Sequence, residues 1–199
     1  MKKLPLLLAL ILCAQLAFAQ SVHVFATYDD FLNGTPTDSL PFRLEQRDQG
    51  DIFMTGGIDN YKFGKVKPRS LKKRLYEEIW GVEQDGEVYI SGYAYSRRKG
   101  FNKVKGSVPY RYFIGEPAIL YENQVALGFI ESGEEAMSVC CKTGYVLLED
   151  GTVKLLTSER LLELVRTDAD ILQGVKDAKY QQEDIYKMFE ALDVYNLKH

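Results

Sequence analysis

Residues 145–165 read YVLLEDGTVKLLTSERLLELV, and within them the chain changes from one kind of secondary structure to another. Asp150-Gly151 is a strong signal for a hairpin turn, because both residue types tolerate positive φ and the runs on either side are apolar. After Thr157 the apolar spacing changes from two residues to three or four, which is the spacing of an amphipathic helix. The sequence therefore predicts an α+β protein in which antiparallel strands are followed by C-terminal helices.

The chain before this stretch carries many further strand signals. A second turn signal, Asp85-Gly86, separates Trp80 to Val82 from Val88 to Tyr95, a run rich in aromatic and β-branched residues. Other short runs that fit a strand are Val22 to Ala26, Phe42 to Glu45, Ile52 to Met54, Tyr61 to Val66, Tyr110 to Ile114, Ala118 to Tyr121, Val125 to Ile130 and Ala136 to Cys141. We expect a mostly antiparallel sheet, and the pattern leaves open whether it curls or closes into a barrel.

Two helices are expected in the first three-quarters of the chain. Thr27-Tyr28-Asp29-Asp30 is close to a capping box and predicts a short N-terminal helix. Ser70 should cap one central helix, in which Leu71, Leu75 and Ile79 form a narrow apolar stripe.

The C-terminal segment, residues 158–199, is predicted to form three helices. Thr167 can cap the second of them. The third has an apolar stripe at i, i+3, i+4 and i+7, formed by Ile185, Met188, Phe189 and Leu192. Because the connections are short and the stripes must be buried, we expect these helices to dock on the strand-rich body, residues 20–157.

The N-terminus has the three parts of a cleavable secretory signal peptide. Lys2 and Lys3 precede the apolar run Leu4 to Leu12, and Ala17-Phe18-Ala19 supplies the small residues that a signal peptidase reads. We expect residues 1–19 to be removed. The apolar run is far shorter than the ~20 residues of a membrane-spanning helix, and no later segment is apolar enough to span. The mature protein is therefore expected to work outside the cytoplasm, without a transmembrane helix.

Few residues of the mature chain suit catalysis near neutral pH. Its histidines are His23 and His199 only, which disfavours a histidine-centred triad or a multi-histidine zinc site. We interpret the adjacent Cys140 and Cys141 as reduced cysteines. No metal-binding or phosphate-binding motif is found, so neither a metal nor a cofactor is predicted.

Three short motifs resemble those of penicillin-recognising serine enzymes. Ser70 and Lys73 form S-x-x-K, Tyr121-Glu122-Asn123 has the form Y-x-N, and Lys142-Thr143-Gly144 is K-T-G. In such an enzyme Ser70 would be a nucleophile activated by Lys73. The interval of about seventy residues is too short for the helical domain that those enzymes place between the first and third motifs. We therefore disfavour a serine-lysine hydrolase and interpret Ser70 as a helix cap and Lys73 as a solvated lysine.

Charge is unevenly distributed along the chain. Residues 61–111 contain thirteen basic and five acidic residues, whereas the whole protein has a net charge of −3. The residues expected to bind an anionic partner are Lys65, Lys67, Arg69, Lys72, Lys73, Arg97, Arg98 and Lys99. On one shared face, they would attract an anionic glycan, a lipid headgroup or an acidic protein surface. Nucleic acid is not an expected partner of an exported protein.

Two plainer interpretations of the basic region remain open. Lysines at strand edges and in loops keep a protein soluble and its edges unpaired. The basic region could also pair internally with the acidic C-terminal helices.

Three segments together resemble a known group of proteins. They are Thr27 to Pro36, the Leu71 to Trp80 helix with the following Val88-Tyr89-Ile90, and the Leu155-Leu156-Thr157 entry into the final helices. These segments resemble uncharacterised exported proteins of Bacteroidota that contain a domain of unknown function. The resemblance implies a periplasmic, outer-membrane-associated or extracellular location in a Gram-negative bacterium, and it supplies no functional residues.

These observations favour a non-catalytic exported protein that acts by binding an envelope component or a protein partner. The alternative is an enzyme of unrecognised type, which would need a deep cleft lined by converging polar groups. A third hypothesis is a carrier of an apolar ligand, which would need a closed sheet with an unfilled interior.

Overall fold

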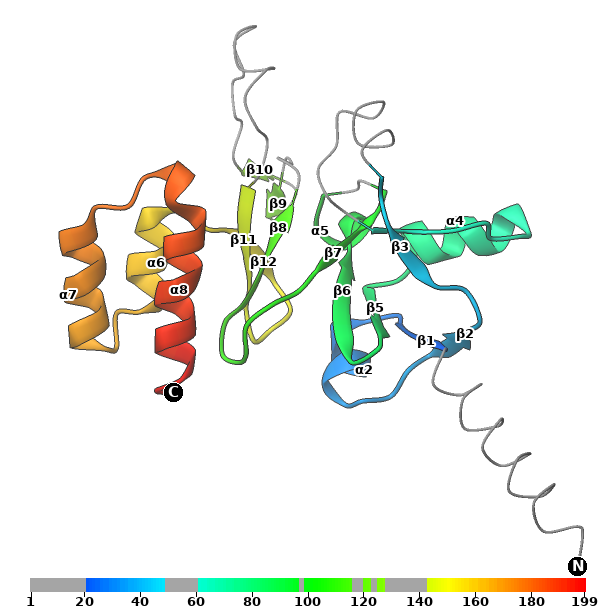
Figure 1. Ribbon diagram of the computed structural model, residues 1–199, viewed down its shortest axis with the longest axis horizontal. Helices are drawn as coiled ribbons and strands as arrows, with labels where there is room; N and C mark the ends of the chain where they lie inside the picture. The colour runs from blue at the N-terminus through cyan, green and yellow to red at the C-terminus, as the bar shows by residue number, and fades with distance from the viewer. Residues whose placement is uncertain (1–20, 49–60, 97–98, 116–119, 123–124, 128–142) are drawn as a thin grey trace, which may run out of the picture.

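The computed structural model describes residues 21–48, 61–96, 99–115, 120–122, 125–127 and 143–199 (Figure 1). It confirms the predicted α+β class, because a curled antiparallel sheet of seven strands is combined with smaller sheets and a C-terminal helical segment. The predicted leader and the predicted strands at Ile52 to Met54 and Ala136 to Cys141 lie outside the described residues.

The large sheet has the strand order β2-β1-β5-β6-β7-β4-β3, and all neighbouring strands are antiparallel. Its strands are β1 (Val22–Phe25), β2 (Asp38–Leu40), β3 (Leu44–Gln46), β4 (Tyr61–Phe63), β5 (Gly81–Gln84), β6 (Glu87–Ser91) and β7 (Phe101–Lys103). Asp85 and Gly86 have φ values of 56° and 77°, which confirms the predicted hairpin turn between β5 and β6. Within the described residues the outer strands β2 and β3 do not pair, so this sheet is curled but open.

A smaller sheet has the order β12-β11-β8. It consists of β8 (Arg111–Gly115), β11 (Thr143–Leu147) and β12 (Val153–Leu155), while β9 (Leu120–Glu122) pairs separately with β10 (Val125–Leu127). Gly151 has a φ of 82°, in keeping with the predicted turn between β11 and β12. A bridge between Lys105 and Tyr112 ties β8 to the end of β7, so the two sheets meet along a β7–β8 ribbon.

The capping box at Thr27 is confirmed, whereas the predicted start of the central helix is wrong. The Thr27 side chain accepts from the Asp30 backbone N–H, the Asp30 carboxylate accepts from the Thr27 N–H, and α2 (Tyr28–Leu32) follows. The central helix α4 (Arg69–Glu77) starts directly after Pro68, whose extended backbone occupies the N-cap position. Ser70 therefore lies inside the first turn and does not cap the helix.

The prediction that Val88 to Tyr95 forms one strand is also wrong. The strand β6 ends at Ser91, and the next residues form the short helix α5 (Gly92–Ser96). The Gly92 backbone N–H donates to the carbonyl oxygen of Gly100 at 2.8 Å, in register with the β6–β7 pairs. Beyond this bond the chain turns into the helix, where the Ser96 hydroxyl donates to the Gly92 carbonyl oxygen at 2.8 Å.

The C-terminal segment is helical, as predicted. Its elements are α6 (Ser158–Leu164), α7 (Ala169–Ala178), the short 3-10 helix η2 (Gln182–Asp184) and α8 (Ile185–Asn196). The cap of α7 is Asp168 and not Thr167, because the Asp168 carboxylate accepts from the Ile171 N–H at 3.0 Å. A carboxylate also complements the positive end of the helix dipole.

The elements are stacked in layers that share three buried cores. One face of the large sheet packs against α4 through residues such as Leu75, Val82 and Phe101. The opposite face packs against α2 and the small sheet, where Ile90 and Phe113 belong to one cluster. α4 and the C-terminal helices thus lie at opposite ends of the molecule (Figure 1).

The remaining face of the small sheet is covered by the C-terminal helices. Val146 of β11 lies in the same buried cluster as Met188 and Leu192 of α8. Among the described residues, no helix combines the length and apolar character needed to cross a membrane.

Candidate functional site

The first candidate site is a basic surface on and before α4, which we call the α4 basic surface. It consists of Lys65, Lys67, Arg69, Lys72 and Lys73, all of them exposed. The later turns of the helix bury Leu75 and Tyr76 in the core, whereas the first turn contains no buried residue. These are the first five of the eight residues predicted to bind an anion, and all five are exposed on α4 or in the segment directly before it.

This surface is almost uncompensated by acidic groups. Lys73 Nζ is 3.9 Å from the Glu77 carboxylate, which is a weak ion pair in solvent. The other four cations form no ion pair with any carboxylate in the described parts of the chain. The neighbouring Arg74 is different, because it pairs with Asp38 at 2.7 Å.

These cations lie at the N-terminal end of α4, where the helix dipole adds to their positive electrostatic potential. The first turn of α4 contains Arg69 and Lys72 and no acidic residue. The N-terminal end of a helix carries a partial positive charge, so cations there are electrostatically unfavourable. These two residues therefore do not stabilise the helix by their charge, and the helix dipole strengthens their attraction for an anion.

Of the three remaining predicted anion-binding residues, the structure describes only Lys99. Lys99 is exposed, and its carbonyl oxygen accepts a hydrogen bond from Arg47 at 3.3 Å. Arg97 and Arg98 lie outside the described residues. Lys103 pairs with Glu87 at 3.1 Å, and Arg111 lies 4.9 Å above the ring of Phe31. The α4 basic surface is therefore the part of the prediction that the structure can place.

No ion pair joins the α4 basic surface to the C-terminal helices in the regions that the structure describes. The carboxylates of that segment pair locally, as Glu163 does with Arg160 at 2.6 Å and Asp168 with Lys198 at 3.0 Å. Internal pairing with the acidic tail therefore does not account for the basic surface.

The described parts of the three hydrolase-like motifs do not converge. Ser70 and Lys73 are exposed on α4, whereas Thr143 and Gly144 are buried in β11, in a different layer (Figure 1). Lys142 and Asn123 lie outside the described residues. His23 is partly exposed on β1, where its Nδ1 lies 3.1 Å from Ser39 Oγ. Among the described residues, no three His, Cys, Asp or Glu side chains could together hold a metal ion.

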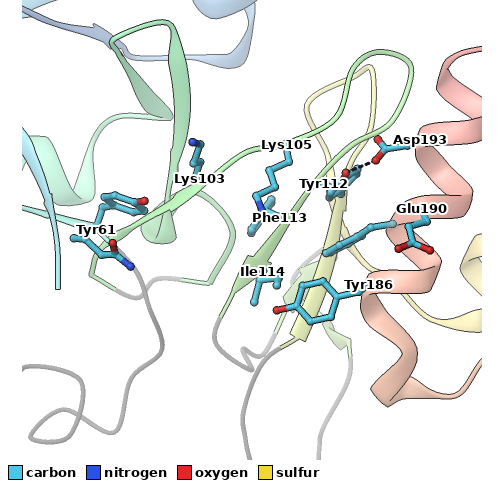
Figure 2. A pocket seen from close by; sticks show the side chains of 11 residues that line it. Tyr61, Lys103, Lys105, Tyr112, Phe113, Ile114, Tyr186, Glu190 and Asp193 are labelled. Atoms are coloured by element: carbon cyan, nitrogen blue, oxygen red, sulfur yellow. Dashed lines mark hydrogen bonds between the residues drawn. The ribbon is translucent and has the colours of Figure 1, made fainter. Parts of the chain in front are cut away.

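The second candidate site is a cleft of about 490 Å³ that sequence reasoning missed (Figure 2). Its floor is the β7–β8 ribbon, with Lys103, Lys105, Tyr112, Phe113 and Ile114. One wall is α8, which contributes Tyr186, Phe189, Glu190 and Asp193, and the other contains Gln46 and Tyr61. These residues come from segments far apart in the chain, so no local motif could reveal the cleft.

The cleft is built around one stacked pair of rings. Tyr112 and Phe189 stack with 4.1 Å between ring centroids, and the Tyr112 hydroxyl donates to Asp193 at 2.6 Å. Burial, with the adjacent Asp193 carboxylate as a second cause, raises the pKa of Tyr112 above its ordinary value, so the phenol stays protonated. This contact fixes α8 against β8 and leaves Asp193 with further capacity to accept hydrogen bonds.

Comparisons with known proteins give a family but no activity. Residues 23–199 match the model of a family described as a family of unknown function (DUF6563). No curated protein and no solved structure is significantly similar to the chain.

Proposed function

The chain belongs to this family of unknown function, and from its geometry we propose that it is a non-catalytic exported protein that binds an anionic partner through the α4 basic surface. The partner we propose is an envelope component that carries phosphate, carboxylate or sulfate groups, such as an acidic glycan or a lipid headgroup. The proposed location is the periplasm, the outer membrane or the outside of a Gram-negative cell of the Bacteroidota type.

One observation carries the binding proposal. Lys65, Lys67, Arg69 and Lys72 are exposed, close in sequence, and unpaired with any described carboxylate, although the protein as a whole is acidic. Clustered charges of one sign attract a partner of the opposite sign and raise its rate of association. Binding of this kind weakens as salt rises, because the Debye length falls to about 8 Å at physiological ionic strength.

The proposed export depends on the leader-like residues 1–19. They have a basic start, an apolar centre and a small-residue cleavage site, and the family match begins shortly afterwards, at residue 23. Fractionation of cells followed by mass spectrometry tests this part. A mature N-terminus at Gln20 in the envelope or medium is expected, and an intact Met1 in the cytosol would contradict it.

A charge-reversal variant tests the binding surface. We expect Lys67→Glu/Arg69→Glu/Lys72→Glu to elute from immobilised heparin, used as an anionic glycan, at a clearly lower salt concentration than the wild type. The variant should remain folded, because the residues are exposed and acidic groups in the first turn suit the helix dipole.

The matched control places the same change of charge at the other end of the molecule. Arg166→Glu/Lys176→Glu/Lys179→Glu reverses three exposed cations in or near α6 and α7. Its elution should be close to that of the wild type. Equal losses in both triple variants would show an effect of net charge alone and would refute the α4 basic surface as the site.

A further inference from the structure

The cleft between α8 and the β7–β8 ribbon carries opposite charges on its two sides. Figure 2 shows Lys103 and Lys105 on the ribbon, and Glu190 and Asp193 on the facing helix. Lys103 is already compensated, since its Nζ is 3.1 Å from the Glu87 carboxylate and this hydrogen bond raises the pKa of the lysine. Lys105 is exposed and forms no ion pair within the described parts of the chain. The cleft therefore offers one available cation on its floor.

The α8 wall of the cleft carries two carboxylates. Glu190 is exposed and has no ion-pair partner among the described residues, and Asp193 accepts one hydrogen bond, from Tyr112. Each carboxylate follows an aromatic residue by four positions on α8, Glu190 after Tyr186 and Asp193 after Phe189, so each pair shares one side of the helix in the cleft. Tyr186 is 57% exposed, so its ring is available to a ligand. Carboxylates next to aromatic faces suit an ammonium group, which gains both a charge-assisted hydrogen bond and a cation–π contact.

We propose that this cleft binds a small zwitterion, with its ammonium group at the α8 wall and its anionic group at Lys105. The volume of about 490 Å³ falls within the range of small-molecule sites. A wholly apolar ligand would desolvate Lys105 and Glu190 without replacing their water, which is costly. A ligand with one charge would leave the charge on the other side uncompensated. The zwitterion is the class that satisfies both sides.

The zwitterion proposal can be tested by calorimetric titration of the folded full chain. We expect ε-aminocaproate, which carries an amine and a carboxylate, to bind at least about ten-fold more tightly than caproate or hexylamine, which each carry one charge. Glycerophosphoethanolamine, in which a phosphate replaces the carboxylate, distinguishes a lipid-headgroup source from an amino-acid source. Equal affinity for the zwitterions and the singly charged compounds, or no binding of either zwitterion, would overturn the proposal.

Two single variants assign the two ends of the ligand. Glu190→Gln should reduce binding of the zwitterion and of hexylamine by about ten-fold and leave binding of caproate unchanged. Lys105→Gln should reduce binding of the zwitterion and of caproate by about ten-fold and leave binding of hexylamine unchanged. Both side chains are exposed, so the fold should persist, which circular dichroism can verify. Glu78→Gln and Lys176→Gln, at exposed positions directly after α4 and on α7, are the matched controls and should bind as the wild type does. Loss of binding in the controls, or none in the two cleft variants, would refute the assignment.

Discussion

At the scale of single residues, the contact between β8 and α8 depends on polar groups as well as rings. Tyr112 donates to Asp193, and one turn further along α8 the buried Asn196 binds the loop before β8. The Asn196 side-chain amide donates to the carbonyl oxygens of Ser107 and Tyr110, at 3.1 and 2.8 Å, and accepts from the Tyr110 N–H at 3.1 Å. Buried polar groups are costly to leave unpaired, so these bonds define how the helix lies on the sheet.

Tyr112 gives the protein a measurable dependence on alkaline pH. Its pKa is raised in the folded state, mainly by burial, whereas in the unfolded chain it is about 10. The folded state therefore retains this proton more strongly, so its contribution to stability is complete below pH about 10 and is lost as pH rises further. In urea unfolding, Tyr112→Phe should be less stable than the wild type by about 1 kcal/mol near neutral pH.

The difference between Tyr112→Phe and the wild type should shrink above pH about 10, because the variant has no phenol to ionise at this position. Tyr28, Tyr76, Tyr89 and Tyr110 also have raised pKa values, mainly from burial, and they are present in both proteins. They provide an internal control, since their effect cancels in the difference. A constant difference across this pH range would contradict the role of the Tyr112 phenol.

At the scale of elements, hairpins and amphipathic stripes were predictable, and element boundaries were less so. Asp85-Gly86 forms its turn with both residues at positive φ, because the required conformation is local. The end of β6 could not be read from the sequence, because Val88 to Tyr95 suits a strand throughout. At that point the Ser91 hydroxyl oxygen accepts from the Tyr93 N–H at 3.2 Å and contacts the Tyr76 carbonyl oxygen at 3.4 Å, and the second of these contacts depends on the distant α4.

The two candidate sites also differ in how far they could be predicted from the sequence. The α4 basic surface is a local run of charge, and a helix with one apolar stripe exposes such a run. The cleft joins Gln46 and Tyr61 to the β7–β8 ribbon and α8, and this joining depends on the packing of separate layers. The one sequence signal for it is Tyr186, an aromatic residue that lies outside the buried stripe of its helix.

Leu75 tests how much α4 depends on its buried face. The side chain has no exposed surface and lies among residues of the large sheet, so Leu75→Ala removes buried methyl groups and leaves a cavity. We expect a loss of about 3 kcal/mol in the free energy of unfolding, measured by urea denaturation. Lys72→Ala, at an exposed position in the first turn of the same helix, should change stability by less than about 0.5 kcal/mol. Similar values for the two variants would contradict the burial of Leu75 beneath α4.

At the scale of the whole molecule, the layers are joined by strands that contribute residues to two cores. β8 and β11 contribute Phe113 and Tyr145 to the core shared with the large sheet, and these rings stack at 5.2 Å. The same strands contribute Tyr112 and Val146 to the core shared with the C-terminal helices. Because both faces of the small sheet are buried, a disturbance on one face should destabilise the whole stack.

Gly144 of β11 provides a test of this coupling. A Cβ atom at this position would lie 2.9 Å from Ile185 Cγ2 and 3.4 Å from Phe189 Cζ, so any side chain there presses on α8. Valine suits a strand better than glycine does, so a purely local view predicts that Gly144→Val stabilises the protein. We expect the opposite, a loss of about 2 kcal/mol from overpacking, measured by urea denaturation.

The origin of the Gly144→Val effect can be isolated in two ways. Gly174→Val, on α7 where a Cβ meets no atom within 4 Å, is the matched control and should be nearly neutral. Adding Ile185→Ala to Gly144→Val makes room for the new side chain, so the double variant should lose less stability than the two single losses combined. Strict additivity would mean that α8 does not press on β11 at this position, and the proposed coupling between the small sheet and the C-terminal helices would then fail at the contact that should show it most directly.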